Sequence, residues 1–118
     1  MNRIEDLKIW KKSVELCKDV YELSHEIPHN EKYGLQSQIK RSAVSIPSNI
    51  AEGAGRNSKK EFKYFLSVAN GSAYELHTQL TLLDELKLIT KDKLEYVLIK
   101  VMEIQKMNYG LQRSLAIT

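Results

Sequence analysis

The chain is poor in the residues that interrupt helices or cross-link a fold. Its 118 residues include one cysteine, two prolines and five glycines. A single thiol, Cys17, makes neither an internal disulfide nor a cysteine zinc site, so nothing requires an oxidising compartment and a cytoplasmic protein is expected. Strand-like alternation of apolar and polar residues is nearly absent, which excludes an all-β fold. The few prolines and glycines exclude collagen-like and disordered chains.

Long apolar runs are also missing. The chain is 42% hydrophobic and 28% charged, which is enough apolar surface for a core but leaves charges in every segment. We therefore expect no membrane span, and no secretory signal because Glu5 and Asp6 interrupt the first ten residues. The length is that of one folding unit, so a single all-α domain over residues 1–118 is expected.

The first predicted helix covers residues 3–25. Leu7, Val14 and Tyr21 are spaced by seven, with Trp10 and Cys17 between them, which predicts a stripe facing the other helices. A second apolar line widens this stripe and consists of Ile9, Leu16, Val20 and Leu23. Two buried faces are therefore predicted for this helix, which ends before Pro28 because proline disfavours helical geometry in the residue before it.

The second predicted helix covers residues 31–54, with Asn30 as its N-cap. Pro47 lies inside it and removes one hydrogen bond to the preceding turn, so a kink or a local break is expected there. Ser45 or Ser48 is expected to satisfy the carbonyl that is freed. The helix is expected to stop at Gly53 and Gly55.

Two further helices follow. Ser58 and Glu61 have the spacing of a capping box, which predicts a third helix of roughly 27 residues that ends near Leu88. Thr90 is the predicted cap of a fourth helix that continues to Leu115. Short connections place consecutive helices antiparallel, so the sequence predicts an up-down-up-down four-helix bundle with a proline-kinked second helix.

The residue patterns of helical enzymes are not found. A di-iron bundle needs two Glu-x-x-His motifs, and this chain has one, at Glu22 and His25. No arginine is followed by a histidine at the four-to-six-residue spacing of small helical ribonucleases of the HEPN type. Cys17 falls on an apolar line, where a packed, unreactive thiol is the usual state. We predict no enzyme, no metal site and no cofactor.

Small polar residues interrupt the apolar lines of the second and third helices. We predict a structural polar network between these helices, comprising Arg41, Ser45, Asn49, Glu52 and Glu75. In it, Arg41 and Glu75 would form a buried, hydrogen-bonded pair. A network that sets the helix register and a small-molecule pocket are both compatible with this pattern. Gly71 lies inside the third helix, where glycine is unfavourable unless another helix or subunit packs closely against it.

Positive charge is concentrated in one stretch of the chain. Residues 32–63 contain seven basic and two acidic side chains, a balance of +5, whereas the remainder carries −2. The basic residues are Lys32, Lys40, Arg41, Arg56, Lys59, Lys60 and Lys63. A local positive field of this kind attracts a polyanion, although an ordinary solvated helix face has the same composition.

Several motifs resemble one protein family. They are DLKIW from Asp6, EKYGLQSQIKRSAVSIPSNIAEG from Glu31, EFKYFL from Glu61 and ANGSAYELHTQL from Ala69. Together they are similar to the four-helix-bundle proteins encoded in intervening sequences of bacterial 23S rRNA genes, with relatives beside diversity-generating reverse transcriptases. The resemblance implies an all-α homo-oligomer, with a pentamer favoured, that binds nucleic acid and has no enzymatic activity.

Two functions follow from the resemblance and the charge. In the first, an oligomer binds structured RNA, with phosphate contacts from Lys40, Arg56, Lys59, Lys60 and Lys63, and with Arg41 in either the patch or the polar network. Aromatic residues near this patch, Tyr33, Tyr64 and Phe65, would stack on unpaired bases, although core packing is the expected role of Phe65. In the second, the chain is a protein-interaction module that docks a partner such as a reverse transcriptase, without contacting nucleic acid.

Overall fold

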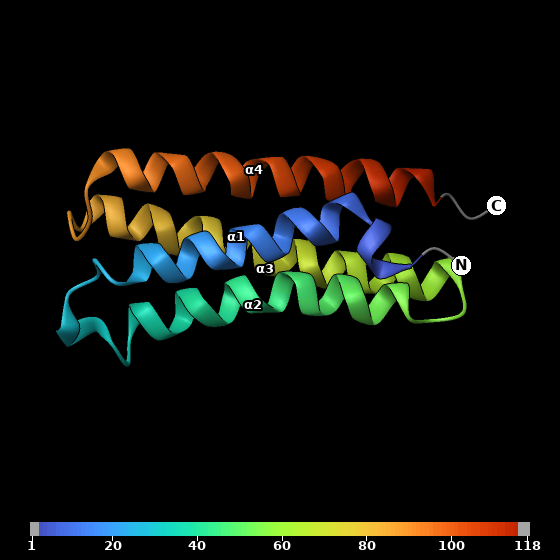
Figure 1. Ribbon diagram of the computed structural model, residues 1–118, viewed down its shortest axis with the longest axis horizontal. Helices are drawn as coiled ribbons and strands as arrows, with labels where there is room; N and C mark the ends of the chain where they lie inside the picture. The colour runs from blue at the N-terminus through green and yellow to red at the C-terminus, as the bar shows by residue number, and fades with distance from the viewer. Residues whose placement is uncertain (1–2, 116–118) are drawn as a thin grey trace.

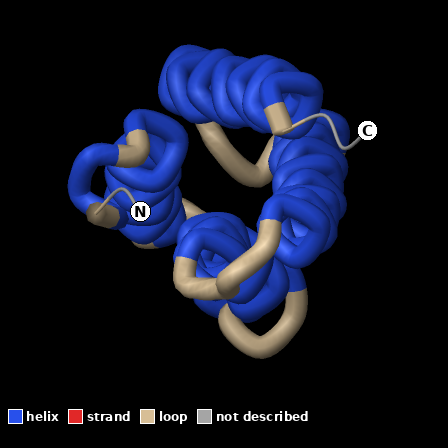
Figure 2. Tube along the Cα trace, turned by 90° about the vertical axis from the view of Figure 1, so that its right-hand side faces the viewer, coloured by secondary structure: helices blue, strands red, loops and turns tan. Residues whose placement is uncertain are grey.

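The computed structural model describes residues 3–115, and its regular secondary structure over that range is entirely helical (Figure 2). The four long helices are α1 (Lys8–Ser24), α2 (Leu35–Ala54), α3 (Lys59–Glu85) and α4 (Lys91–Ser114). Two short 3₁₀ turns, η1 (Ile4–Asp6) and η2 (His29–Glu31), precede α1 and α2. The predicted all-α, four-helix class is confirmed.

The helices lie side by side in an elongated body of 48 × 21 × 20 Å, with connections at alternating ends (Figure 1). α2 packs against α1 and α3, and α4 packs against α3 and α1, so the four helices form a closed ring around one apolar core. α2 and α3 are the most closely packed pair. The connection between them lies at the same end of the bundle as the start of α1 and the end of α4 (Figure 1).

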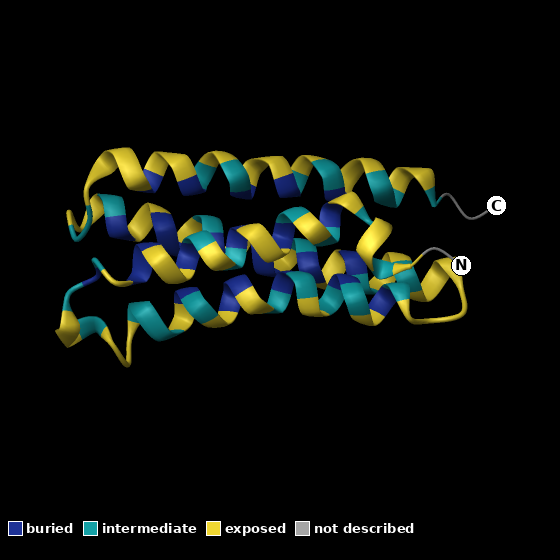
Figure 3. Cartoon of the chain, viewed as in Figure 1, coloured by how far each residue is buried: buried dark blue, intermediate teal, exposed yellow. Residues whose placement is uncertain are grey.

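Only one of the two apolar lines predicted on α1 is buried along its whole length. Ile9, Leu16, Val20 and Leu23 lie in the core with at most 3% of their surface exposed. On the other line, Trp10 and Cys17 are half-buried and pack against the core, whereas Val14 and Tyr21 are 42% and 43% exposed, so the second predicted face is buried only in part. In a closed ring each helix has one face toward the centre, and the line of Val14 and Tyr21 is left at the surface. Figure 3 shows the buried stripe of each helix turned inward.

Helix α2 begins four residues later than predicted. Asn30 lies in the 3₁₀ turn and does not cap α2, whose N-cap residue is Gly34. The Glu31 carboxylate accepts a hydrogen bond from the Leu35 amide at 3.4 Å and so satisfies a free N–H group of the first turn. The chain crosses from α1 to α2 between buried Ile27 and half-buried Leu35, and the turn at residues 29–31 lies within that crossing.

Helix α2 runs without a break through Pro47. Because proline has no N–H, the carbonyl of Ala43 loses its helical partner. The Cys17 thiol of α1 donates to that oxygen at an Sγ–O distance of 2.8 Å, so the partner is Cys17 and not Ser45 or Ser48 as expected. Burial raises the pKa of this thiol to about 11, which keeps its proton in place for donation at neutral pH.

The start and length of α3 agree with the sequence pattern. The Ser58 Oγ accepts from the Glu61 amide at 3.1 Å and donates to the Glu61 carboxylate at 3.3 Å, so the predicted cap is formed. The helix has the 27 residues expected. Thr90 occupies the N-cap position of α4, but its side chain makes no capping hydrogen bond.

Candidate nucleic-acid interface

Charge differs between the two halves of the bundle. We define the basic half as residues 3–16, 45–71 and 103–115, which share the end that contains the α2–α3 connection. This half carries ten basic and six acidic side chains, whereas the described remainder carries eight and nine. The basic half therefore has a net charge of +4, and the rest of the described chain has a net charge of −1. The positive field is concentrated toward one end of the bundle.

Three lysines at the start of α3 form the centre of the basic half. Lys59, Lys60 and Lys63 are all exposed, and none of them forms an ion pair within residues 3–115. They lie in the first turns of a helix, where free backbone N–H groups add further positive potential. A surface hollow of about 200 Å³ beside them is lined by Lys59, Arg56 and Asn57, among other residues. The three lysine side chains are therefore available to bind an external anion.

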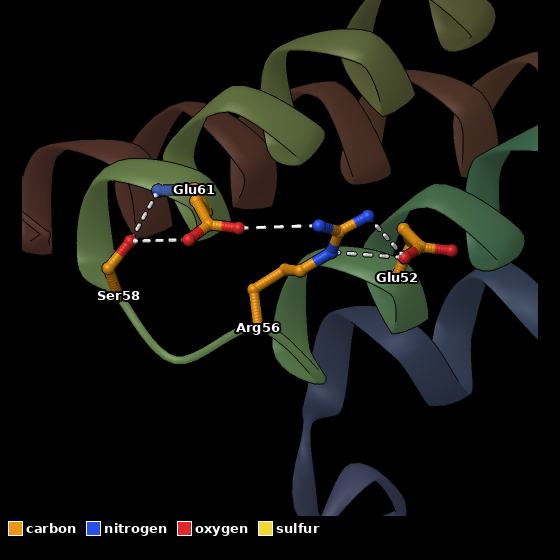
Figure 4. Close-up of polar contacts among 4 residues, drawn as sticks. All are labelled: Glu52, Arg56, Ser58 and Glu61. Atoms are coloured by element: carbon orange, nitrogen blue, oxygen red, sulfur yellow. Dashed lines mark hydrogen bonds and ion pairs between the residues drawn. The ribbon is translucent and has the colours of Figure 1, made fainter.

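Arg56 is engaged within the protein. Its guanidinium contacts the Glu52 carboxylate at 2.8 Å and the Glu61 carboxylate at 3.4 Å (Figure 4). It also lies 4.9 Å from the centre of the Phe65 ring. The two carboxylates together exceed its single positive charge, and the contacts tie the end of α2 to the first turn of α3. Arg56 therefore holds the connection in shape and presents little unpaired charge.

Lys40 and Arg41 lie apart from the other predicted contacts. The chain from Lys40 to the last residue of α2, Ala54, is helical throughout and covers about 21 Å along the helix axis. The Lys40 ammonium lies 5.0 Å from the centre of the Tyr21 ring, and Arg41 is exposed. The six predicted residues are thus divided into an end cluster and a separate pair.

The predicted polar network is smaller than expected. The Ser45 hydroxyl pairs with the Ser72 hydroxyl at 2.8 Å, and the Asn49 amide donates to the Ser45 carbonyl at 2.9 Å and to its hydroxyl at 3.0 Å. Arg41 and Glu75 are both exposed, and no hydrogen bond or ion pair joins them within residues 3–115, so the expected buried pair is not formed. Both side chains are long enough to reach solvent, where their charges are hydrated without a partner.

Close packing of α2 on α3 depends on a glycine. A Cβ atom at Gly53 would lie 2.7 Å from the Phe65 Cβ and 3.2 Å from the Phe62 carbonyl oxygen, which is closer than packed atoms approach. The sequence pattern had indicated Gly53 as a helix stop, yet it lies inside α2 and is buried against α3. Its role is to let the two helices meet just before the connection that leads into the α3 lysines.

Polar residues of α4 were missed by the sequence analysis. Asn108 is 1% exposed, and its amide donates to the Leu66 carbonyl of α3 at 2.9 Å. Gln112 donates to Asn108 at 2.6 Å and accepts from Ser67 at 3.2 Å, so a polar chain connects α3 and α4. The sequence pattern could have indicated a buried polar residue here, because Asn108 continues the apolar spacing of Val101 and Ile104 with a polar side chain.

An acidic groove lies between α1 and α4 in the other half. It has a volume of about 350 Å³ and is lined by Asp19, Glu22, Leu23, Glu26, Asp92, Lys93, Tyr96 and Val97. Lys93 pairs with Glu26, and Lys100 pairs with Asp19. The hydrogen bond to Asp19 raises the pKa of Lys100 above its usual range.

Within residues 3–115 no three His, Cys, Asp or Glu side chains converge as a metal site requires. The part of the chain that the structure describes also contains no helix with the length and apolarity needed to cross a bilayer.

Comparisons with known proteins identify the family. A search of curated proteins finds no match. One similar solved structure is a protein of unknown function from the S23 ribosomal protein family of Bacteroides thetaiotaomicron VPI-5482, with a TM-score of 0.81 and 28% sequence identity, covering 88% of this chain and 97% of that one. The model of the family described as 23S rRNA-intervening sequence protein matches residues 5–110. The chain therefore belongs to the 23S rRNA-intervening sequence protein family.

Proposed function

We propose that the protein is a non-enzymatic, self-associating helical bundle of the cytoplasm that binds structured RNA through its basic half. The observation that carries this proposal is the cluster of Lys59, Lys60 and Lys63, which is exposed and has no carboxylate partner within the described residues. Unpaired lysines at the start of a helix suit the phosphates of a nucleic-acid backbone.

Recognition of this kind depends on backbone charge and shape. The lysine side chains reach out from one end of a rigid bundle, and phosphate contacts position a nucleic acid without reading its sequence. We keep Lys40 and Arg41 as secondary contacts, because a long RNA that binds at the end cluster has phosphates about 20 Å further along α2 as well. Arg56 shapes the connection and contributes less to the field.

Self-association is supported by apolar side chains left at the surface. Val14 and Tyr21 of α1 and Val44 of α2 are each 42% to 43% exposed, on helices that pack against each other. Burying them against a second copy removes apolar surface from water. A ring of copies, with a pentamer favoured, repeats the basic half by rotation and increases the attraction for a polyanion.

A salt titration tests the proposed function. Binding of a fluorescein-labelled RNA hairpin is measured by anisotropy for the native protein and for the Lys59→Gln, Lys60→Gln, Lys63→Gln triple variant. The slope of log affinity against log salt should fall by about two to three in magnitude, because each lost phosphate contact removes about 0.9 from it. Lys18→Gln, Lys87→Gln, Lys91→Gln is the matched control, since these lysines are exposed, lie outside the basic half and give the same change in charge. Equal slopes for the two triple variants would contradict the proposal.

The alternative is a protein-interaction module without a role in RNA binding. The half-exposed line of α1 favours it, as does the surface at Gly71, where no atom lies within 4 Å of the place that a Cβ would take and a partner helix has room to approach. Absence of any RNA binding, together with capture of a host protein that is lost in Val14→Glu, Val44→Glu, supports this alternative.

A further inference from the structure

A groove between α3 and α4 has a composition that differs from the rest of the surface. Its volume is about 300 Å³, and it is lined by Asn70, Tyr74, Met102, Gln105, Lys106 and Tyr109. Each helix contributes one tyrosine, and the two side chains are largely in solvent, with Tyr74 56% and Tyr109 65% exposed. Two exposed aromatic rings on opposite walls offer flat surfaces for a flat ligand. We call this hollow the tyrosine groove.

One polar atom in the tyrosine groove has no partner. The Asn70 Oδ1 is buried from solvent and accepts no hydrogen bond within the protein. The neighbouring amide, Gln105 Nε2, lies 3.2 Å from the His77 Nδ1 and is therefore engaged. An acceptor that is shielded from water and unpaired is unfavourable, and a ligand with an N–H donor relieves that cost.

Positive charge flanks the same groove. Lys106 lines it, is exposed and forms no ion pair within residues 3–115. The Arg113 guanidinium lies 5.7 Å from the centre of the Tyr109 ring. Tyr109 thus has a cation one turn before it and another one turn after it along α4, and both cations lie within the basic half. The groove therefore combines exposed aromatic surface, a buried acceptor without a hydrogen-bond partner, and cationic groups.

We propose that the tyrosine groove binds an unpaired nucleobase of single-stranded RNA. The base stacks on Tyr74 and Tyr109, a ring or exocyclic N–H donates to the Asn70 Oδ1, and Lys106 contacts an adjacent phosphate. This inference rests on the proposed RNA-binding function and deepens it, because the lysines at the start of α3 bind paired and unpaired strands alike. The tyrosine groove adds a preference for unpaired nucleotides.

Tyrosine variants test this assignment. Binding of a single-stranded RNA without self-complementarity, and of the same strand in a duplex, is measured for Tyr74→Leu, Tyr109→Leu. Affinity for the single strand should fall about tenfold or more, because aromatic stacking is lost, while duplex affinity changes less than about twofold. Tyr74→Phe, Tyr109→Phe keeps the rings and should bind like the native protein. Tyr96→Leu is the matched control on α4, since its side chain is 56% exposed and lies outside the groove.

Equal affinity of the Tyr96→Leu and double leucine variants for the single strand would overturn the assignment, as would an equal loss for the duplex. A second measurement uses the native protein, so it does not depend on how the variants fold. Adenosine monophosphate is added at millimolar concentration, and side-chain amide signals of Asn70 and Gln105 are followed by NMR. These signals should shift with the ligand, and shifts confined to other residues would contradict the proposal.

The two proposals fail in different ways. If the native protein binds neither the single strand nor the duplex, the proposed RNA-binding function is wrong and this inference fails with it. If both RNAs bind and the α3 lysine variant weakens both, while the tyrosine variants bind normally, the proposed function stands and the tyrosine groove is not a base site.

Discussion

The α2/α3 and α1/α4 interfaces differ in the side chains that form them. Between α2 and α3, small residues allow close approach at two points, where Gly53 lies against Phe65 and the Ser45 hydroxyl pairs with the Ser72 hydroxyl. Between α1 and α4 long charged side chains bridge the helices, as Lys12 does to Glu103 at 3.1 Å. Small residues bring helix backbones together, whereas long ion pairs span a wider and wetter boundary.

This difference bears on where the protein binds its ligand. The closely packed α2 and α3 are joined by the connection that contains Arg56, and the lysines lie in the first turns of α3, so they are held on the most closely packed pair of helices. The α1/α4 side contains the acidic groove, and these two helices are less closely packed than α2 and α3. A charged end cluster is most useful when its spacing is maintained, because positioned contacts lose less entropy on binding.

The largest effect is expected at Gly53. Gly53→Ala places a methyl group 2.7 Å from the Phe65 Cβ, so α2 and α3 must separate and stability should fall by about 1–3 kcal/mol. Gly71→Ala is the matched control inside α3, because no atom lies within 4 Å of its added methyl. It should gain about 0.5–1 kcal/mol from higher helix propensity. Urea unfolding followed by circular dichroism measures both, and equal changes at the two glycines would contradict the close-packing explanation.

The next effect concerns the thiol that compensates for the proline of α2. Cys17→Ala leaves the Ala43 carbonyl without its donor and should cost about 1–3 kcal/mol in unfolding free energy. In a Pro47→Ala background the restored N–H of residue 47 bonds that carbonyl within the helix, so the same change should cost less. A double-mutant cycle by urea unfolding measures this coupling. Additive effects would show that Cys17 contributes by packing alone.

The smallest changes in unfolding free energy are expected when one polar contact is removed from each interface. Ser72→Ala removes the hydroxyl pair with Ser45 and should cost about 0.5–1.5 kcal/mol, independently of salt. Asp19→Asn removes the ion pair with Lys100 and should cost about 0–1 kcal/mol, less so at high salt because partly exposed charges are screened. Thermal unfolding at low and high salt distinguishes them. A salt-dependent loss in Ser72→Ala would show that the two interfaces do not differ as described.

Much of the fold was accessible from local patterns. The spacing of apolar residues located four helices, and the pair of Ser58 and Glu61 located the start of α3, because helix periodicity and capping depend on neighbours in the chain. The start of α2 was placed at Asn30, where a 3₁₀ turn forms instead. The residue at which α2 begins depends on how Ile27 and Leu35 pack into the core, and that packing involves residues distant in the sequence.

The candidate site was less accessible. The sequence grouped six basic residues by their order along the chain, and the structure separates Lys40 and Arg41 from the α3 lysines by most of the length of α2. The tyrosine groove combines residues of α3 and α4 that are distant in sequence, and no local pattern indicated it.

Helicity, the number of helices and the family likeness could all be read from the order of the residues, because periodicity and short motifs carry them. The packed bundle was needed to show which line of α1 is buried, that Cys17 donates to the carbonyl freed by Pro47, and that two carboxylates contact Arg56. Burial and pairing depend on what a neighbouring helix places opposite a side chain, and that neighbour is often distant along the chain.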